Sequence, residues 1–338
     1  MNRTAPSSAR AALCLLAGLG LIGAAPQGHA QSFEEFISGD NGAILDGREK
    51  IRSMPPVLRQ QLVSIAAADR GRIGVAALDL TTGASVSILG EQAFPMASTS
   101  KIAIAATFLA GVDAGRYRLQ DRYPLQIPVA SRPFDGPVAP VKPGMQVAAE
   151  RLIELMITRS DNSATDAMLK AVGGPKAVTE WLRNAGLSRQ RIDRDIATLV
   201  RDDGEFDPVT VVDERDSTPP EEMVALIAGL YQGKWLSPES RDLLVNTMTR
   251  TVTGSRRIKA GLPSGSRFGH KTGTLNNTAS DVGFVELPDG RVIVMAIYVT
   301  GQGGRPQRDQ RIAQITRVLY DGFTESRFAA LATAQTQN

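Results

Sequence analysis

Residues 267–300 read RFGHKTGTLNNTASDVGFVELPDGRVIVMAIYVT. Three runs within this stretch are rich in apolar and β-branched residues and have the length of strands: 267–274, 281–287 and 291–300. Two further runs near the other end of the chain have the same character: Ile73–Leu80 and Ser85–Leu89. These five segments predict one antiparallel sheet that is built from both ends of the chain.

The segment between the two groups of strands has the pattern of helices. Apolar residues of 98–112 fall on every side of a helix, which is typical of a buried central helix. Thr218 with Glu221 forms a capping-box signature, and Ser237-Pro238 is a second helix start. We expect further helices over these ranges: 55–69, 152–159, 163–172, 175–185, 219–232, 238–249 and 306–328.

The prediction is therefore an α/β fold, with an antiparallel five-stranded sheet flanked by terminal helices and an all-helical lobe beside it. Residues 117–147 are rich in proline and indicate irregular structure, and residues 191–216 indicate a long charged loop. The expected catalytic domain is 54–330. Its sheet lobe comprises residues 54–95 and 250–330, and its helical lobe comprises residues 96–249.

The N-terminus has the pattern of a secretory signal peptide. Arg3 and Arg10 precede an apolar run over 11–25, and Gly28-His29-Ala30 places small residues at the cleavage positions. We expect cleavage after residue 30 and export, with the periplasm as the compartment; a retained signal anchor is the alternative. Two segments remain outside the domain: an N-terminal arm over residues 31–53 and a tail over residues 331–338.

The composition of the exported chain excludes several kinds of chemistry. The formal net charge falls from +3 to +3 − 2 = +1 when Arg3 and Arg10 are removed, and no cluster of basic residues suggests a nucleic-acid partner. Cys14 and His29 are lost as well, which leaves His270 as the single histidine and no cysteine. Disulfides, cysteine nucleophiles and Cys/His zinc sites are therefore excluded, and we expect no metal and no cofactor. His270 is expected to have a structural role on one face of its strand.

A serine and a lysine open the buried helix in the run Ser98-Thr99-Ser100-Lys101. Positions i and i+3 share one face of a helix, so Ser98 and Lys101 are expected to point the same way. A neutral amine can take the proton that a serine hydroxyl must lose before it attacks a carbonyl. An N-capping serine beside a surface lysine is the alternative, but a lysine within an apolar helix needs a partner or a function.

Two more polar motifs follow at the edges of buried elements. Ser160-Asp161-Asn162 ends the second apolar helix, and Lys271-Thr272-Gly273-Thr274 lies in the first of the late strands. A cation, hydroxyls and a glycine in one strand can bind a carboxylate and allow a substrate backbone to approach. The alternatives are a polar turn that ends a helix and an edge strand protected by lysine.

These three motifs, in this order, resemble those of the class A β-lactamases among the penicillin-recognising serine enzymes. The resemblance runs from about Gly71 to Phe323. It implies that Ser98 is acylated, that Lys101 accepts or relays its proton, and that Ser160 passes a proton to the leaving nitrogen. It also implies substrate-binding roles for these residues: Asn162, Lys271, Thr272, Gly273 and Thr274.

The resemblance further implies an oxyanion hole made of the backbone N–H groups of Ser98 and Thr274. Family members commonly add an arginine that holds the substrate carboxylate. No arginine follows Thr274 on its strand, and Arg257 occupies the alternative place; the competing interpretation is a solvated arginine in a basic turn. A salt bridge that closes the long loop is expected between Arg194 and Asp216.

One position departs from the family pattern. Class A β-lactamases carry a loop glutamate, two residues after the arginine, that positions the water for hydrolysis of the acyl-enzyme. Here that position is Ile196, and the loop is several residues longer than usual. The candidate substitutes are Asp195 and Glu205. The remaining loop acids, Asp202, Asp203 and Asp207, could also swing into the site or stay solvated.

Three functions remain open from the sequence. The first is an exported class A-type β-lactamase that works through a Ser98 acyl-enzyme. The second is a DD-peptidase-like penicillin-binding protein that acts on peptidoglycan stem peptides and releases β-lactams slowly. The third is a binder of β-lactams or muropeptides with little turnover. The expected partners are these small molecules, with no nucleic acid and no stable membrane span, and we expect a monomer.

Overall fold

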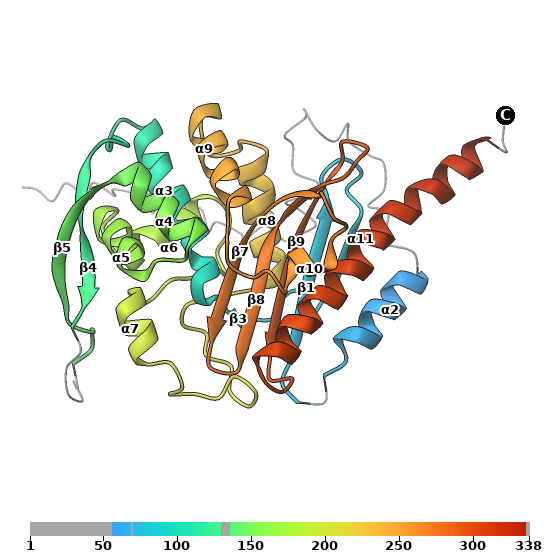
Figure 1. Cartoon of the computed structure of the whole chain (residues 1–338), viewed down its shortest axis with the longest axis horizontal. Coiled ribbons are helices and arrows are strands. Elements are labelled where there is room, and N and C mark those ends of the chain that lie inside the picture. The colour runs from blue at the N-terminus through green and yellow to red at the C-terminus, as the bar shows by residue number, and fades with distance from the viewer. Residues whose placement is uncertain (1–55, 69, 130–135, 336–338) are drawn as a thin grey trace, which may run out of the picture.

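A computed structural model describes residues 56–68, 70–129 and 136–335 of the chain. The signal-peptide prediction and the predicted arm lie outside these residues. Figure 1 shows a sheet beside a group of helices. The sheet has five antiparallel strands in the order β2-β1-β9-β8-β7, which confirms the predicted sheet. Its strands are β1 Ile73–Asp79, β2 Ser85–Ile88, β7 Arg267–Leu275, β8 Thr278–Glu286 and β9 Val292–Thr300.

The two faces of the sheet are covered by different parts of the chain. Helices α2 (Pro56–Ala66) and α11 (Arg305–Gln335) pack together over one face, while α8 (Pro220–Tyr231) contacts β1, β8 and β9 from the other. Strand β1 is buried along its whole length because its side chains alternate between two cores. Val75 and Ala77 join the core beneath the terminal helices, and Ala76 and Leu78 join the core of the helical lobe.

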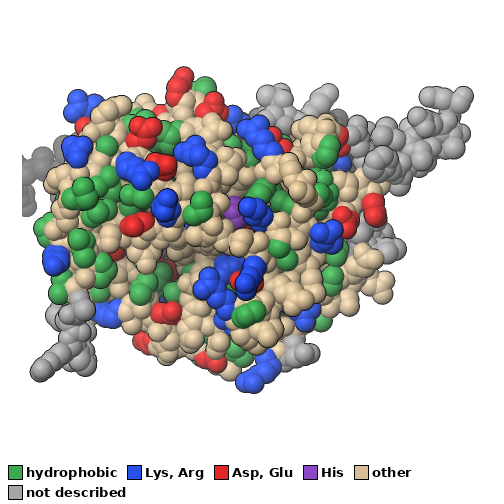
Figure 2. Space-filling model, in the orientation of Figure 1, with side chains coloured by type: hydrophobic (Ala, Val, Ile, Leu, Met, Phe, Trp, Pro, Cys, Tyr) green, Lys and Arg blue, Asp and Glu red, His purple; other side chains and the backbone are tan. Residues whose placement is uncertain are grey.

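The helical lobe is built around α3 (Lys101–Asp113), whose side chains are buried on every side as the sequence predicted. A short 3-10 turn, η1 (Ala97–Ser100), leads into it. The other helices are α4 Ala149–Thr158, α5 Asn162–Ala171, α6 Pro175–Asn184, α7 Ile196–Arg201, α9 Pro238–Thr249 and α10 Ile258–Gly261. Lys and Arg side chains are scattered among acidic and neutral ones over the face in Figure 2.

Three local predictions were wrong. The proline-rich segment forms a hairpin of β4 (Arg122–Pro128) and β5 (Val141–Ala148), because a two-stranded ribbon leaves edge positions where proline needs no partner. The charged loop contains α7, and a short strand after it, β6 (Ser217–Thr218), pairs with β3 (Phe94–Pro95).

The third error concerns a helix cap. Pro219 occupies the N-cap of α8 and no side chain caps it, since the Thr218 hydroxyl donates to the carbonyl of Pro219 instead. The predicted start of α9 is confirmed, because the Ser237 hydroxyl accepts the Ser240 N–H at 3.2 Å. Within the described ranges, every helix is too short or too polar to cross a bilayer.

Candidate active site

Three segments that are distant in sequence meet at one edge of the sheet. They are the η1–α3 junction with Ser98 and Lys101, the α4–α5 turn with Ser160, and strand β7 with Lys271. Glycine at position 273 permits this meeting. A Cβ built there would lie 2.6 Å from the Met96 carbonyl oxygen and 2.4 Å from the Ser280 hydroxyl. Any larger residue would push β7 away from the turn that carries Ser98.

The Ser160 hydroxyl lies between two buried lysine side chains. Its Oγ is 3.1 Å from Lys101 Nζ and 2.9 Å from Lys271 Nζ. Lys101 also donates to the Ser160 carbonyl at 2.8 Å and to Asn162 Oδ1 at 2.7 Å. These three acceptors use all three protons of an ammonium group. Lys101 can therefore act as a base only after it loses one of them.

Burial weakens the hold of both lysines on their protons. Both side chains are fully buried, and desolvation lowers the pKa of Lys101 to about 7, opposed by the negative charges of Asp166 and Asp161. Desolvation also lowers the pKa of Lys271 well below its usual range, with repulsion from Lys101 acting in the same direction and Asp281 opposing it. A lysine with a pKa near 7 carries a substantial neutral fraction at neutral pH.

The backbone is strained at the residues that aim these groups. Ala97, directly before Ser98, has φ 48°, and Ser160 has φ 58°, both in the left-handed region that disfavours residues with a side chain. Such conformations persist only where the surrounding structure imposes them, and they concentrate at functional sites. Ser98 is half-buried, and Asn162 and Thr274 are exposed.

Arg257 is buried, with 1% of its surface exposed, so the interpretation as a solvated arginine was wrong. Its Nε binds Asp309 Oδ1 at 2.6 Å, and its Nη1 donates to the carbonyls of Gly273 and Ser280, both at 2.8 Å. Nη2 donates to the Thr274 hydroxyl at 2.8 Å. The guanidinium therefore fixes β7 and the Thr274 hydroxyl from behind the strand. On the same strand, the Thr272 and Thr253 hydroxyls are 2.7 Å apart.

His270 points away from this chemistry. Its Nδ1 lies 2.9 Å from Asp281 Oδ1, and both side chains are buried within the sheet. The Asp281 carboxylate also accepts the Ile258 N–H at 3.1 Å. This pair joins β7, β8 and the start of α10.

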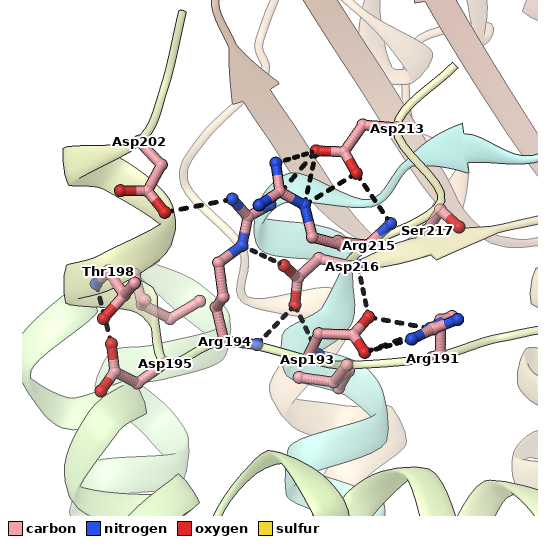
Figure 3. Close-up of polar contacts among 12 residues, drawn as sticks. Arg191, Asp193, Arg194, Asp195, Thr198, Asp202, Asp213, Arg215, Asp216 and Ser217 are labelled. Atoms are coloured by element: carbon pink, nitrogen blue, oxygen red, sulfur yellow. Dashed lines mark hydrogen bonds and ion pairs between the residues drawn. The ribbon is translucent and has the colours of Figure 1, made fainter. Parts of the chain in front are cut away.

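The long loop is organised around Arg194, as Figure 3 shows. Its Nε lies 2.7 Å from Asp216 Oδ2, which is the pairing expected from the sequence, and its other nitrogens lie 3.3 Å from Asp202 and 3.7 Å from Asp213. Asp216 is buried and has φ 49°. Its Oδ1 accepts the backbone N–H groups of Asp193 and Arg194 at 2.8 and 3.1 Å. This carboxylate closes the loop at its base.

Ile196 begins α7 and is buried, with 4% of its surface exposed. Its backbone N–H donates to Asp166 Oδ1 at 2.7 Å, and the Ala197 N–H donates to Asp166 Oδ2 at 2.9 Å. Burial raises the pKa of Asp166 to about 6, although these two N–H groups oppose the shift. The sequence patterns did not single out Asp166. Its position four residues after Asn162, on the same helix face, is the one signal that could have done so.

The two candidate loop acids are already engaged elsewhere. Asp195 caps α7, because its Oδ1 accepts the Thr198 N–H at 2.8 Å. Glu205 is exposed and pairs with Arg215 at 3.0 Å. Neither carboxylate has a hydrogen bond to Ser160 or to Lys101 in the described structure.

Asp216→Ala should lower the free energy of unfolding by roughly 3 kcal/mol, because it leaves Arg194 and two backbone N–H groups without their buried acceptor. Urea unfolding measures the change, and limited proteolysis should show cleavage within 193–216. Arg191→Ala is the control, since Arg191 forms an exposed pair with Asp193 worth at most about 1 kcal/mol. Equal stability of the two variants would show that Asp216 does not hold the loop.

Comparison with known proteins agrees with this geometry. A family model described as the beta-lactamase enzyme family matches residues 57–323. The extended-spectrum beta-lactamase PER-1 of Pseudomonas aeruginosa is 27% identical over 289 residues, covering 82% of this chain and 90% of that protein. An ancestral class A β-lactamase structure aligns with a TM-score of 0.67 and 36% identity, covering 78% of this chain and 99% of that chain. A mutant of PBP-A, solved as an acyl-enzyme complex with penicillin G, aligns with a TM-score of 0.70 and 31% identity, covering 82% and 100%. The chain belongs to the class A β-lactamase family of serine hydrolases.

Proposed function

We propose that this protein is an exported serine hydrolase. β-Lactams acylate Ser98 readily, and hydrolysis of the resulting acyl-enzyme is slow. The asymmetry of the site carries the proposal. The Ser160 hydroxyl lies between the buried amines of Lys101 and Lys271, which suits proton transfer during acylation. The loop position at which the family holds its hydrolytic glutamate is the buried Ile196, which suits a slow second step.

Acylation begins when the neutral amine of Lys101 takes the proton of the Ser98 hydroxyl. The serine oxygen attacks the carbonyl carbon of the β-lactam, and the N–H groups of Ser98 and Thr274 stabilise the negative charge that develops on the carbonyl oxygen. The ring C–N bond then breaks as its nitrogen receives the proton of the Ser160 hydroxyl. Lys101 returns the serine proton to Ser160, so the amine is neutral again.

The substrate carboxylate binds along β7. The Lys271 amine and the Thr272 and Thr274 hydroxyls supply hydrogen bonds, and Arg257 holds the Thr274 hydroxyl in place. Asn162 is exposed at the cleft and its side-chain oxygen contacts Lys101, so the same residue can hold the amide of the substrate side chain. These roles are the ones that the family resemblance implies, and the placement of the residues around Ser160 supports them.

Among the described residues, no carboxylate is placed as a base for deacylation. The side chain of Ile196 cannot take a proton from water, and both oxygens of Asp166 already accept backbone N–H groups beneath it. Asp195 is used as a helix cap and Glu205 as an ion-pair partner. A positioned general base typically contributes about 10²–10⁴-fold, so hydrolysis of the adduct should be slower by roughly that factor.

A DD-peptidase-like reaction is the second candidate, and one observation favours it. Strand β7 ends the sheet, and within the described residues it pairs with β8 alone. An extended peptide can align with such an edge through backbone hydrogen bonds. Peptidoglycan stems that end in D-Ala-D-Ala are the corresponding substrate class. The third possibility, binding without turnover, is disfavoured by the contact of both lysines with Ser160.

Export is part of the proposal and rests on the sequence of residues 1–30, which lie outside the described structure. The charged start, the apolar run and the small residues before the cleavage position support it. The periplasm is the compartment where peptidoglycan would be available to such an enzyme.

Intact-protein mass spectrometry of the chain from residue 31, mixed with benzylpenicillin, tests the function directly. We expect a covalent adduct that persists for many minutes, together with slow turnover of nitrocefin. Ser98→Ala should form no adduct. Absence of an adduct on the unaltered chain would contradict the proposal, whereas a fleeting adduct with fast turnover would contradict the slow second step.

The pH dependence of acylation should follow Lys101. Because its pKa is lowered to about 7, the amine becomes neutral as the pH rises through that value. The acylation rate constant should increase roughly tenfold between pH 6 and pH 8 and then level off. Stopped-flow measurements with a fluorescent penicillin give the profile. Lys101→Arg stays cationic and should not be acylated at any of these pH values; a flat profile would exclude Lys101 as the base.

Ile196→Glu should accelerate deacylation by roughly 10²-fold or more, because it places a carboxylate where the family holds its general base. The decay of the penicillin adduct, followed by mass spectrometry, measures the effect. Ile196→Gln is the matched control, since it has the same shape without a base. If both variants release the adduct as slowly as the unaltered chain, position 196 does not face the acyl-enzyme.

A further inference from the structure

Strand β7 presents substrate-binding side chains on both of its faces. Lys271 reaches the Ser160 hydroxyl from one face. Because side chains alternate along a strand, three other residues of β7 project from the opposite face: His270, Thr272 and Thr274. Residues 251–258, which lead from α9 into α10, form a turn that lies against this second face. The position of the turn therefore bears on the two threonine hydroxyls.

The turn contacts both of these hydroxyls directly. The hydroxyls of Thr253 and Thr272 are 2.7 Å apart, and Arg257 donates to the Thr274 hydroxyl at 2.8 Å. The turn is also packed tightly on the strand. Gly254 has φ 75°, and a Cβ built on it would lie 2.4 Å from Cγ2 of Thr272. A shift of the turn would therefore move the partners of both hydroxyls.

A buried histidine and aspartate fasten this turn to the sheet. His270 Nδ1 lies 2.9 Å from Asp281 Oδ1 and 3.1 Å from Asp281 Oδ2. Asp281 Oδ2 accepts the backbone N–H of Ile258, at the end of the turn, at 3.1 Å. At the beginning of the turn, the Thr251 hydroxyl donates to the His270 carbonyl at 2.8 Å. The two residues therefore hold both ends of the turn.

His270 serves this pair as a hydrogen-bond donor. An ionised carboxylate can only accept, so Nδ1 of the ring carries the proton. Within the part of the chain that the structure describes, Nε2 is buried without a hydrogen-bond partner, so the ring acts through Nδ1 alone. Asp281 is itself fully buried, and the Ile258 N–H is its other donor. Removal of the ring would leave a buried carboxylate short of donors, which is strongly unfavourable.

We propose that His270 and Asp281 are positioning residues for recognition of the substrate carboxylate, because they hold the turn of residues 251–258 that sets the Thr272 and Thr274 hydroxyls. This inference rests on the proposed function, in which these hydroxyls bind the carboxylate. Neither His270 nor Asp281 touches the reacting atoms. Their effect on substrates is exerted through the turn.

Benzylpenicillin and its methyl ester provide the test, since the ester lacks the free carboxylate. The second-order rate constant for acylation of Ser98 is measured for each compound by mass spectrometry. The ratio of acid to ester then reports recognition of the carboxylate. In His270→Leu this ratio should fall about tenfold, the usual worth of a hydrogen bond to a charged group. A change that only lowers the amount of folded protein slows both compounds equally and leaves the ratio unchanged.

Two further variants show whether the hydrogen bond causes the effect. His270→Asn is the conservative variant, because the asparagine amide can donate from the place of the ring Nδ1. Its ratio should remain close to that of the unaltered chain. Val285→Ala is the control for loosening of the sheet, since Val285 is a buried residue of β8 that packs in the core beneath the terminal helices. Its ratio should also be unchanged.

The hydrogen bond can also be observed without any substitution. The chain from residue 31 contains His270 as its single histidine, so the ring signals of a sample without a histidine tag have one source. A proton–nitrogen correlation spectrum of the isotope-labelled protein at neutral pH should show a proton on Nδ1. A ring without a proton on Nδ1 would overturn the proposal, even if His270→Leu fails to fold.

The outcomes separate this inference from the proposed function. If benzylpenicillin does not acylate Ser98 in the unaltered chain, the proposed function fails and this inference fails with it. If it does, and His270→Leu keeps the ratio of the unaltered chain, the positioning role is wrong and the proposed function stands. An equal fall in Val285→Ala would assign the effect to loosening of the sheet and would also overturn the role. Equal rates for acid and ester in the unaltered chain would show that β7 does not recognise the carboxylate, while acylation of Ser98 would stand.

Discussion

Two buried lysine amines that share one serine hydroxyl impose the main constraint on this structure. Ser160 Oγ lies within 3.1 Å of Lys101 Nζ and 2.9 Å of Lys271 Nζ. Placing two amines so close together, away from water, is unfavourable unless acceptors surround them and their pKa values fall. The fold supplies both: the left-handed backbone of Ser160 turns its carbonyl toward Lys101, and Asn162 adds a third acceptor. Three segments must meet for this to happen, and glycine at position 273 lets the last of them approach.

The carboxylates near these lysines have two effects. They oppose the fall in the lysine pKa values, and one of them also holds the loop at the position of the family glutamate. Asp166 and Asp281 lie on elements behind the two amines and oppose the fall in their pKa values. Asp166 also binds the N–H groups of Ile196 and Ala197, so the backbone at position 196 is held whatever side chain it carries. Loss of the acidic side chain therefore changes the chemistry available to the acyl-enzyme without requiring a change in the path of the loop.

Much of the architecture could be predicted because the spacing of apolar residues along the chain differs between the strand segments and the helix segments. Short apolar runs at both ends indicated one sheet, and the apolar surround of α3 indicated a central helix; the structure has both. The hairpin of β4 and β5 could not be predicted, since proline at Pro124 and Pro143 argues against a strand unless the ribbon is known to have open edges. Asp166 could not be singled out because its partners, the N–H groups of Ile196 and Ala197, lie far along the sequence. The burial of Arg257 could not be predicted either, because its partner Asp309 is also distant in sequence.

The pairing of β1 with β9 has a consequence for how the chain reaches this structure. Ala76 faces Ala296 across that pair, so the middle of the sheet joins residues that are far apart in the sequence. Until β9 emerges from the ribosome, β1 can pair with β2 alone, and an isolated two-stranded hairpin is at best marginally stable. Contacts of such long sequence separation slow folding. The sheet therefore cannot close until β9 has been synthesised, so the residues of β1 that join the two cores stay uncovered until then.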